Sequence, residues 1–173
     1  MAAGGKDRAS ERQQKVSMTI SRERLVPVPA EELWREVEDL GKLSEWFTPA
    51  ERFEPLDGKG LGRRQRMHGH WGKKESEIDQ VVVAFEPPYR IAWEHESERL
   101  DGKPAPEFAR STYFEIRLIP RPEGAMVRLR SVQEPAGIIK GLAMRLFGKR
   151  EVASHFERSL RNLPGDAPVA RGP

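Results

Sequence analysis

The chain has 173 residues, enough for one domain that buries roughly two-thirds of the surface of its unfolded chain. Apolar residues make up 37% and charged residues 33%, so the apolar residues must be concentrated on a few faces. The absence of cysteine excludes disulfides, a thiol nucleophile and a thiolate metal site.

The charge is nearly balanced, with 30 Lys and Arg against 27 Asp and Glu, a net charge of +3. No stretch reaches the ~20 apolar residues of a membrane span, and the N-terminus has no apolar segment typical of a secretory signal, so we expect a cytoplasmic protein. Basic clusters occur at residues 63–66, 73–74 and 149–150. No helix-turn-helix, zinc-finger or RNP pattern accompanies them, which disfavours nucleic acid as a partner.

Two tails flank one predicted domain. Residues 1–14 and 164–173 lack apolar periodicity and are rich in small, charged, Gly or Pro residues, a composition that predicts disorder. The domain between them, residues 15–163, holds every segment with the period of a strand or a helix.

A strand and two short helices open the domain. Alternation of apolar and polar residues predicts a first strand over residues 16–26. Pro29 and the two glutamates after it mark a helix N-terminus, because proline fits the first turn and the helix dipole favours carboxylates there. Gly41 is the predicted C-cap of this helix, and residues 42–47 form a second helix with two aromatic residues at its end.

Six further strands follow, joined mostly by tight turns. The glycines of residues 57–60 suit a turn that needs positive φ, and residues 98–107 form a longer loop. Period-2 alternation predicts the strands at residues 51–56, 62–71, 75–85, 89–97, 111–119 and 125–133. The pattern is an antiparallel meander.

The helical period returns over residues 138–163, which predicts a C-terminal helix that Pro164 and Gly165 end. Gly148 lies between its two apolar stripes. Glycine costs about 1 kcal/mol relative to alanine in a helix interior, so the helix either bends or divides there.

The order β-α-α-β-β-β-β-β-β-α carries a family resemblance. The segments that carry it are LVPVPAEELWREVEDLGKLSEWF, PPYRIAW, STYFEIRLIP, GAMVRLRSV and FERSLRNL. Over residues 15–163 the chain resembles the polyketide cyclase/dehydrase and lipid-transport branch of the START-like, or Bet v 1-like (SRPBCC), superfamily. The resemblance implies an α+β helix-grip fold, a seven-stranded curved antiparallel sheet around a long C-terminal helix, with two short helices between strands 1 and 2. None of these segments is a catalytic motif.

A strongly curved sheet cannot close completely on one helix, so the resemblance implies a cavity for an apolar ligand. Inward positions are mostly apolar, which is the usual composition of a small-molecule site and also of a filled core. The predicted ligand-binding residues are Trp46, Phe47, Met67, Trp71, Ile91, Trp93, His95, Phe114, Ile116, Val127, Leu129, Ser131, Leu142, Leu146 and Phe156.

Catalytic candidates are few. His95 shares the inward face of its strand with Trp93, and a half-buried imidazole there can act as a general acid or base on an enolisable carbonyl. A histidine satisfied by a nearby hydroxyl, or placed at a wet rim, is the alternative. His155 flanks the buried stripe of the last helix, and we expect it at the surface rather than in the pocket.

Two other polar groups are explained as the solvent side of the sheet. His68 and His70 share one strand face, a spacing that can hold a metal, but arginines extend the same face. Glu75, Glu77 and Asp79 also share a face and are expected to pair with these arginines. No metal and no cofactor is predicted.

Three functions remain open. The first is binding of a hydrophobic small molecule, such as a lipid or polyketide-like compound, for transport, sequestration or sensing. The second is a polyketide cyclase, aromatase or dehydratase that uses the same cavity, with His95 moving protons. The third is a regulatory interaction module for a protein or nucleic acid.

Overall fold

The computed structural model describes residues 17–106, 109–137 and 148–164. Its strands are β1 (Met18–Val26), β2 (Arg52–Asp57), β3 (Arg64–Trp71), β4 (Lys74–Glu86), β5 (Arg90–Leu100), β6 (Lys103–Pro104), β7 (Ala109–Arg121) and β8 (Gly124–Pro135). Its helices are α1 (Ala30–Glu38), α2 (Leu40–Trp46) and α4 (Lys149–Asn162). The predicted tails and the first part of the predicted C-terminal helix lie outside the described residues.

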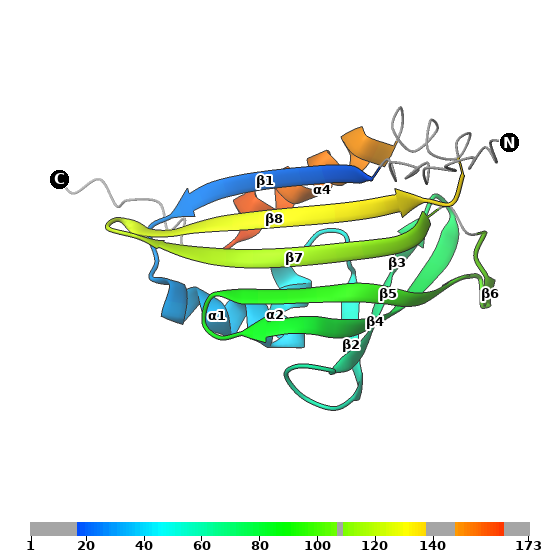
Figure 1. Ribbon diagram of the computed structural model, residues 1–173, viewed down its shortest axis with the longest axis horizontal. Helices are drawn as coiled ribbons and strands as arrows, with labels where there is room; N and C mark the ends of the chain where they lie inside the picture. Colours follow the sequence, from blue (N-terminus) through cyan, green and yellow to red (C-terminus); the bar gives the residue numbers. More distant parts are fainter. Residues whose placement is uncertain (1–16, 107–108, 138–147, 165–173) are drawn as a thin grey trace, which may run out of the picture.

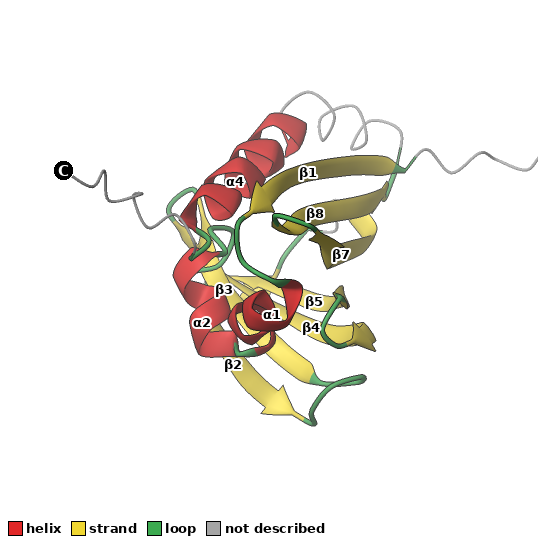
Figure 2. Cartoon of the chain, turned by 90° about the vertical axis from the view of Figure 1, so that its left-hand side faces the viewer, coloured by secondary structure: helices red, strands yellow, loops and turns green. Residues whose placement is uncertain are grey.

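The strands form one antiparallel sheet in the order β1-β8-β7-β5-β4-β3-β2, with β6 paired to the end of β5 (Figure 1). The sheet curves strongly, and the described helices all lie on its concave side (Figure 2). α4 packs along β1, α1 packs against β7, and α2 contacts both β2 and α4. This α+β helix-grip fold, with two short helices between β1 and β2, confirms the architecture that the family resemblance implies.

The core lies between the concave face of the sheet and the helices. Ile91, Ile116 and Leu129 stand opposite one another across β5, β7 and β8 and are fully buried. The next row in the same direction along the sheet consists of Trp93, Phe114 and Ser131. The side chains of successive rows therefore change from branched aliphatic to aromatic and small polar, and this change positions the site described below.

The boundary between the first two helices differs from the prediction. α1 ends at Glu38, and Gly41 lies inside α2 rather than capping α1. Asp39 adopts an extended conformation, and its carboxylate accepts a hydrogen bond from the Lys42 backbone N–H at 3.0 Å. Aspartate is a preferred N-cap residue because it satisfies such a free N–H. The aspartate therefore starts a new helix before the glycine is reached.

The predicted loop at residues 98–107 is partly strand. β5 continues to Leu100, and a turn with positive φ at Asp101 and Gly102 leads into β6. Arg99 ties this extension to β4, because its guanidinium pairs with the carboxylates of Glu77 and Asp79 at 3.1 and 3.3 Å.

None of the helices in the described segments is long and apolar enough to cross a membrane.

Gly124 begins β8 beside the chain that leaves β1. Its φ is +144°, and a Cβ added there would collide with the backbone of Val26, Pro27 and Val28. Gly72, in the β3–β4 turn, has φ +62° but open space around it.

We predict that Gly124→Ala lowers the free energy of unfolding by at least about 2 kcal/mol more than Gly72→Ala, which should cost only about 1–2 kcal/mol of backbone strain. Urea denaturation of both variants measures the difference. Equal destabilisation by the two substitutions would contradict this role of Gly124.

Candidate functional site

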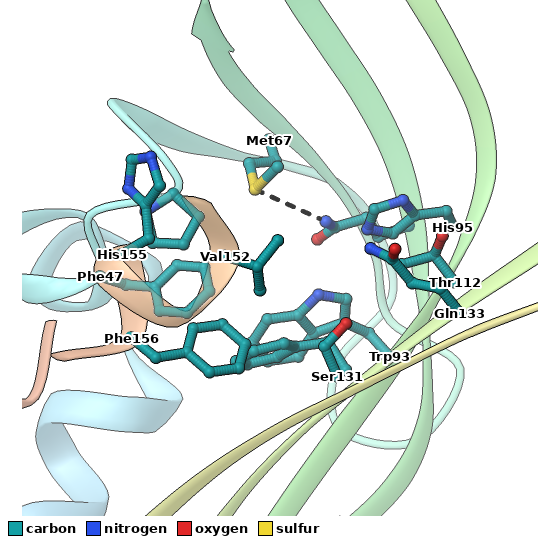
Figure 3. Close-up of a pocket in the computed structure, with 13 residues that line it drawn as sticks. Phe47, Met67, Trp93, His95, Thr112, Ser131, Gln133, Val152, His155 and Phe156 are labelled. Atoms are coloured by element: carbon teal, nitrogen blue, oxygen red, sulfur yellow. Dashed lines mark hydrogen bonds between the residues drawn. The ribbon is translucent and has the colours of Figure 1, made fainter. Parts of the chain in front are cut away.

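A cavity of about 140 Å³ lies between the concave face of the sheet and α4. Strands β3, β4, β5, β7 and β8 contribute to its walls, together with α4 and the segment that follows α2. The lining residues are Phe47, Pro49, Met67, Gln80, Trp93, His95, Thr112, Phe114, Ser131, Gln133, Val152, His155 and Phe156. Figure 3 shows how ten of these side chains surround the space.

One wall of the cavity is aromatic. Phe114 is at its centre, with ring centroids 4.7 Å from Trp93, 4.9 Å from Phe47 and 5.3 Å from Phe156. The Phe47 and Phe156 rings meet Phe114 edge to face, the arrangement that the quadrupoles of aromatic rings favour. Three separate elements, the end of α2, the sheet and α4, therefore meet through this cluster.

The opposite end of the cavity is polar. His95, Thr112 and Gln133 gather there, away from Phe47 and Phe156 (Figure 3). Thr112 and Gln133 are direct neighbours across β7 and β8, one row beyond Phe114 and Ser131. The site is therefore amphipathic. Aromatic rings line one end, and side chains that can form hydrogen bonds line the other end.

The described lining carries no Asp, Glu, Lys or Arg. Burial lowers the pKa of His95 from its usual 6.5 to about 4, because the charged imidazole would lose its hydration. The pKa of His155 is also lowered, first by burial and then by the nearby charge of Arg158. Both rings are therefore neutral at pH 7, and no described residue donates to or accepts from the His95 ring.

His155 contributes to the site, although the sequence favoured a surface position. Its Nδ1 lies 3.2 Å from the Thr48 hydroxyl, and that hydroxyl donates to the His155 carbonyl oxygen at 2.9 Å. The Thr48 backbone N–H also donates to the Ser159 hydroxyl at 3.0 Å. These bonds fasten the chain after α2 to α4, and they turn the His155 side chain toward the cavity margin.

The predicted site residues divide into three groups. Those that line the cavity are Phe47, Met67, Trp93, His95, Phe114, Ser131 and Phe156. Those that do not line it are Trp46, Trp71, Ile91, Ile116, Val127 and Leu129. Leu142 and Leu146 lie outside the described residues. Contact between a ligand and the first group remains a prediction.

The residues that do not line the cavity have clear local reasons. The Trp46 indole faces α1, where its N–H donates to the Glu36 carbonyl oxygen at 3.0 Å. Trp71 ends β3 and is 46% exposed. The four aliphatic residues are fully buried in the filled part of the core. Alternation correctly gives the inward face but not the height along the strand at which side chains stop filling the space.

Sequence reasoning missed Pro49, Gln80, Thr112, Gln133 and Val152. Three of them had a usable signal. Thr112 shares the parity of Phe114, Gln133 that of Ser131, and Gln80 lies between Ile78 and Val82, whose side chains are buried. These three residues were not predicted because they are polar, and the prediction relied on apolar residues and histidines as markers of the cavity.

The convex face of the sheet carries the ion pairs expected from the sequence. The Arg66 guanidinium donates to Asp79 at 2.6 Å and lowers the pKa of that carboxyl from 3.8 to about 2. His68 Nε2 lies 2.8 Å from Glu54, and His70 Nδ1 lies 2.6 Å from Glu51. These histidines therefore serve the outer charge network, and no cluster of three metal-ligating side chains exists in the part of the chain that is described.

Comparison with known proteins gives one family. The family model described as polyketide cyclase / dehydrase and lipid transport matches residues 16–166. No curated protein matches the sequence.

Solved structures share the fold at low identity. A protein of Mesorhizobium loti is 22% identical, with 84% of this chain and 96% of that chain covered and a TM-score of 0.60. A protein of Thermus thermophilus is 19% identical over 84% and 94%, with a TM-score of 0.67. The Zhui aromatase/cyclase of a Streptomyces species is 16% identical over 85% and 91%, with a TM-score of 0.66. At such identities these likenesses show the fold alone.

The lowered pKa of His95 predicts a pH dependence of stability. The unfolded chain takes up this proton near pH 6.5 and the folded chain only near pH 4. The unfolded state therefore binds more protons in this window, and stability falls as the pH drops from about 6.5 to 4, by roughly 3 kcal/mol at most.

We expect the ring protons of His95 to titrate by NMR with a midpoint near pH 4, and His95→Gln to remove this part of the acid destabilisation in urea unfolding. A midpoint at or above 6.5 would show that the cavity does not desolvate the ring.

Proposed function

The chain belongs to the polyketide cyclase / dehydrase and lipid transport family, and we propose that it binds an uncharged, ring-containing small molecule in the cavity between the sheet and α4. One observation carries this proposal: the described lining is aromatic at one end, polar at the other and without net charge at pH 7. Such a lining is typical of sites for small apolar molecules with a few oriented polar groups.

The volume limits the size of the ligand. Sites for drug-sized molecules usually measure about 300–1,000 Å³. The cavity has about 140 Å³, close to the ~150 Å³ in which an engineered apolar cavity holds benzene. A single six-membered ring with a short substituent therefore fits the described space, and its faces meet the rings of Trp93, Phe114 and Phe156.

The absence of charge in the described lining disfavours ionised ligands. Transfer of a carboxylate or an ammonium group into such a space costs several kcal/mol unless a side chain of opposite charge lies next to it. A neutral compound incurs no such cost, so we infer that an ionised fatty acid is a poorer ligand than an uncharged compound of the same shape.

Catalysis by His95 is the second candidate. One observation favours it: the imidazole faces the cavity and has no described hydrogen-bond partner, so it is free to approach a bound carbonyl compound. A general base works best with a pKa near the working pH. A pKa of about 4 makes His95 a weak base at pH 7, and binding without proton transfer is therefore the better supported function.

The third candidate is a nucleic-acid or protein module based on basic clusters, and the cluster at residues 63–66 gives it little support. Arg64 pairs with Glu96 at 2.9 Å, and Arg66 pairs with Asp79 at 2.6 Å. Arg63 is buried. The cluster at residues 63–66 therefore does not present three unpaired cations to a polyanion.

We predict that Ser131→Leu weakens the binding of toluene at least tenfold, because the added side-chain atoms occupy the cavity beside Phe114. Ser111→Leu adds the same atoms at an exposed position of β7 and should change the affinity less than twofold. Isothermal titration calorimetry measures both, and circular dichroism checks that both variants fold. Wild-type affinity of Ser131→Leu for toluene would place the binding site elsewhere.

A deuterium-exchange experiment separates binding from catalysis. If the protein only binds, it should not accelerate exchange of the α protons of acetophenone in D₂O at pH 7, and His95→Gln should bind toluene within about threefold of the wild type. Acceleration of more than tenfold over buffer that disappears in His95→Gln would favour the enzyme instead.

A further inference from the structure

A buried chain of polar side chains leads from the end of α1 to the cavity. It consists of Arg63, Gln65 and Gln80; Arg63 is only 8% exposed and the two glutamines are fully buried. Gln65 and Gln80 stand directly opposite each other across β3 and β4. Burying an amide or a cation costs free energy unless it forms hydrogen bonds, so each hydrogen bond in this polar chain offsets part of that cost.

The hydrogen bonds of this buried polar chain all run in one direction, with Arg63 as the first donor. A guanidinium has only donors. Its Nη1 donates to the Glu38 carbonyl oxygen at 3.0 Å, at the negative end of the α1 dipole, and its Nε donates to Gln65 Oε1 at 3.1 Å. The Gln65 amide oxygen is therefore committed to Arg63, and only its NH₂ group is left for the next partner.

The same order of donor and acceptor continues to the wall of the cavity. Gln65 Nε2 donates to Gln80 Oε1 at 3.0 Å. Because the Gln80 oxygen is now occupied, its NH₂ group is the free end of the chain. One described acceptor is near it, the Met67 sulfur at 3.7 Å (dashed line in Figure 3), and a thioether is a weak acceptor. Both Gln80 and Met67 line the cavity.

We propose that Arg63 and Gln65 hold the Gln80 amide as a hydrogen-bond donor to the bound molecule, which therefore carries an uncharged acceptor such as a ketone or aldehyde oxygen. The inference rests on the proposed function and names the chemical class of the ligand. Gln80 is then the recognition residue. Arg63 is a positioning residue, because it acts on the ligand only through Gln65.

The cost of burying Arg63 supports a functional role. Among the described residues, no carboxylate lies within hydrogen-bond distance of its guanidinium, and its Nη2 has no partner. Burial lowers the pKa of Arg63, although the charges of Glu38 and Asp39 partly oppose the effect. A buried cation without an ion pair is a poor stabiliser of a fold. A role in fixing the direction of the two amides explains why a cation stands at this position.

Three one-ring probes test the proposal. Acetophenone offers a carbonyl acceptor, ethylbenzene has nearly the same shape without one, and benzoate is charged. The readout is the ratio of the affinity for acetophenone to that for ethylbenzene in the same variant, because a general loss of packing changes both affinities together. In the wild type we expect a ratio of at least ten and benzoate weaker than acetophenone.

The variants separate recognition from positioning. Gln80→Leu and Arg63→Met should both bring the ratio close to one while ethylbenzene still binds. Arg63→Lys, which keeps a donor-only group, should restore most of the preference. The carbonyl carbon of ¹³C-labelled acetophenone should resonate further downfield when it is bound to the wild type than when it is bound to Gln80→Leu, because only the wild type offers the Gln80 donor. This comparison does not require Arg63→Met to fold.

A wild-type ratio near one, or an unchanged ratio in Gln80→Leu, would overturn the proposal while leaving the binding function intact. Tighter binding of benzoate than of acetophenone would overturn the proposal and would also contradict the preference for uncharged ligands in the proposed function. If ethylbenzene and toluene also fail to bind the wild-type protein, the proposed function itself fails, and this inference fails with it.

Discussion

The phenyl ring of Phe47 holds the end of α2 inside the curve of the sheet, and both the fold and the cavity depend on it. The ring is 2% exposed and packs edge to face on Trp93 and Phe114, with Phe53 also within ring-contact distance. Each such aromatic pair adds about 0.5–1.5 kcal/mol beyond the burial of its surface. This cluster fills one end of the space under the curved sheet. The small side chains of Thr112 and Ser131 leave the other end open.

Charge is largely separated between the two faces of the sheet, although the buried Arg63 is a cation on the side of the helices. The convex face carries networks such as Arg66 and Arg99 around Asp79, and Arg90 and Arg117 around Glu115, whose carboxylate is covered by these arginines. The concave face has neutral polar groups near the cavity. This separation explains how a chain with 33% charged residues still forms an apolar core. It is also the basis of our proposal that the cavity takes uncharged ligands, since the described lining offers no counter-ion.

Much of the fold follows from the sequence, because alternation and helical spacing report directly on which side chains face the core. The order of strands and helices and the inward placement of Trp93, Phe114 and Phe156 belong to this part. The break at Asp39 was missed because a capping side chain competes with a glycine signal. The site was only half predicted. Gln80 looks like a surface residue in the sequence, and only the pairing of β3 with β4 shows that it continues a buried chain from Arg63.

The central claim is that an uncharged one-ring molecule occupies the space between the aromatic cluster and α4. Intermolecular nuclear Overhauser effects between toluene and the protein test it most directly, because they report contacts within a few ångströms of the ligand. We expect cross-peaks from the toluene ring to the ring protons of Trp93, Phe114 and Phe156. Binding without these cross-peaks, or cross-peaks only to outer residues such as Tyr89, would contradict it.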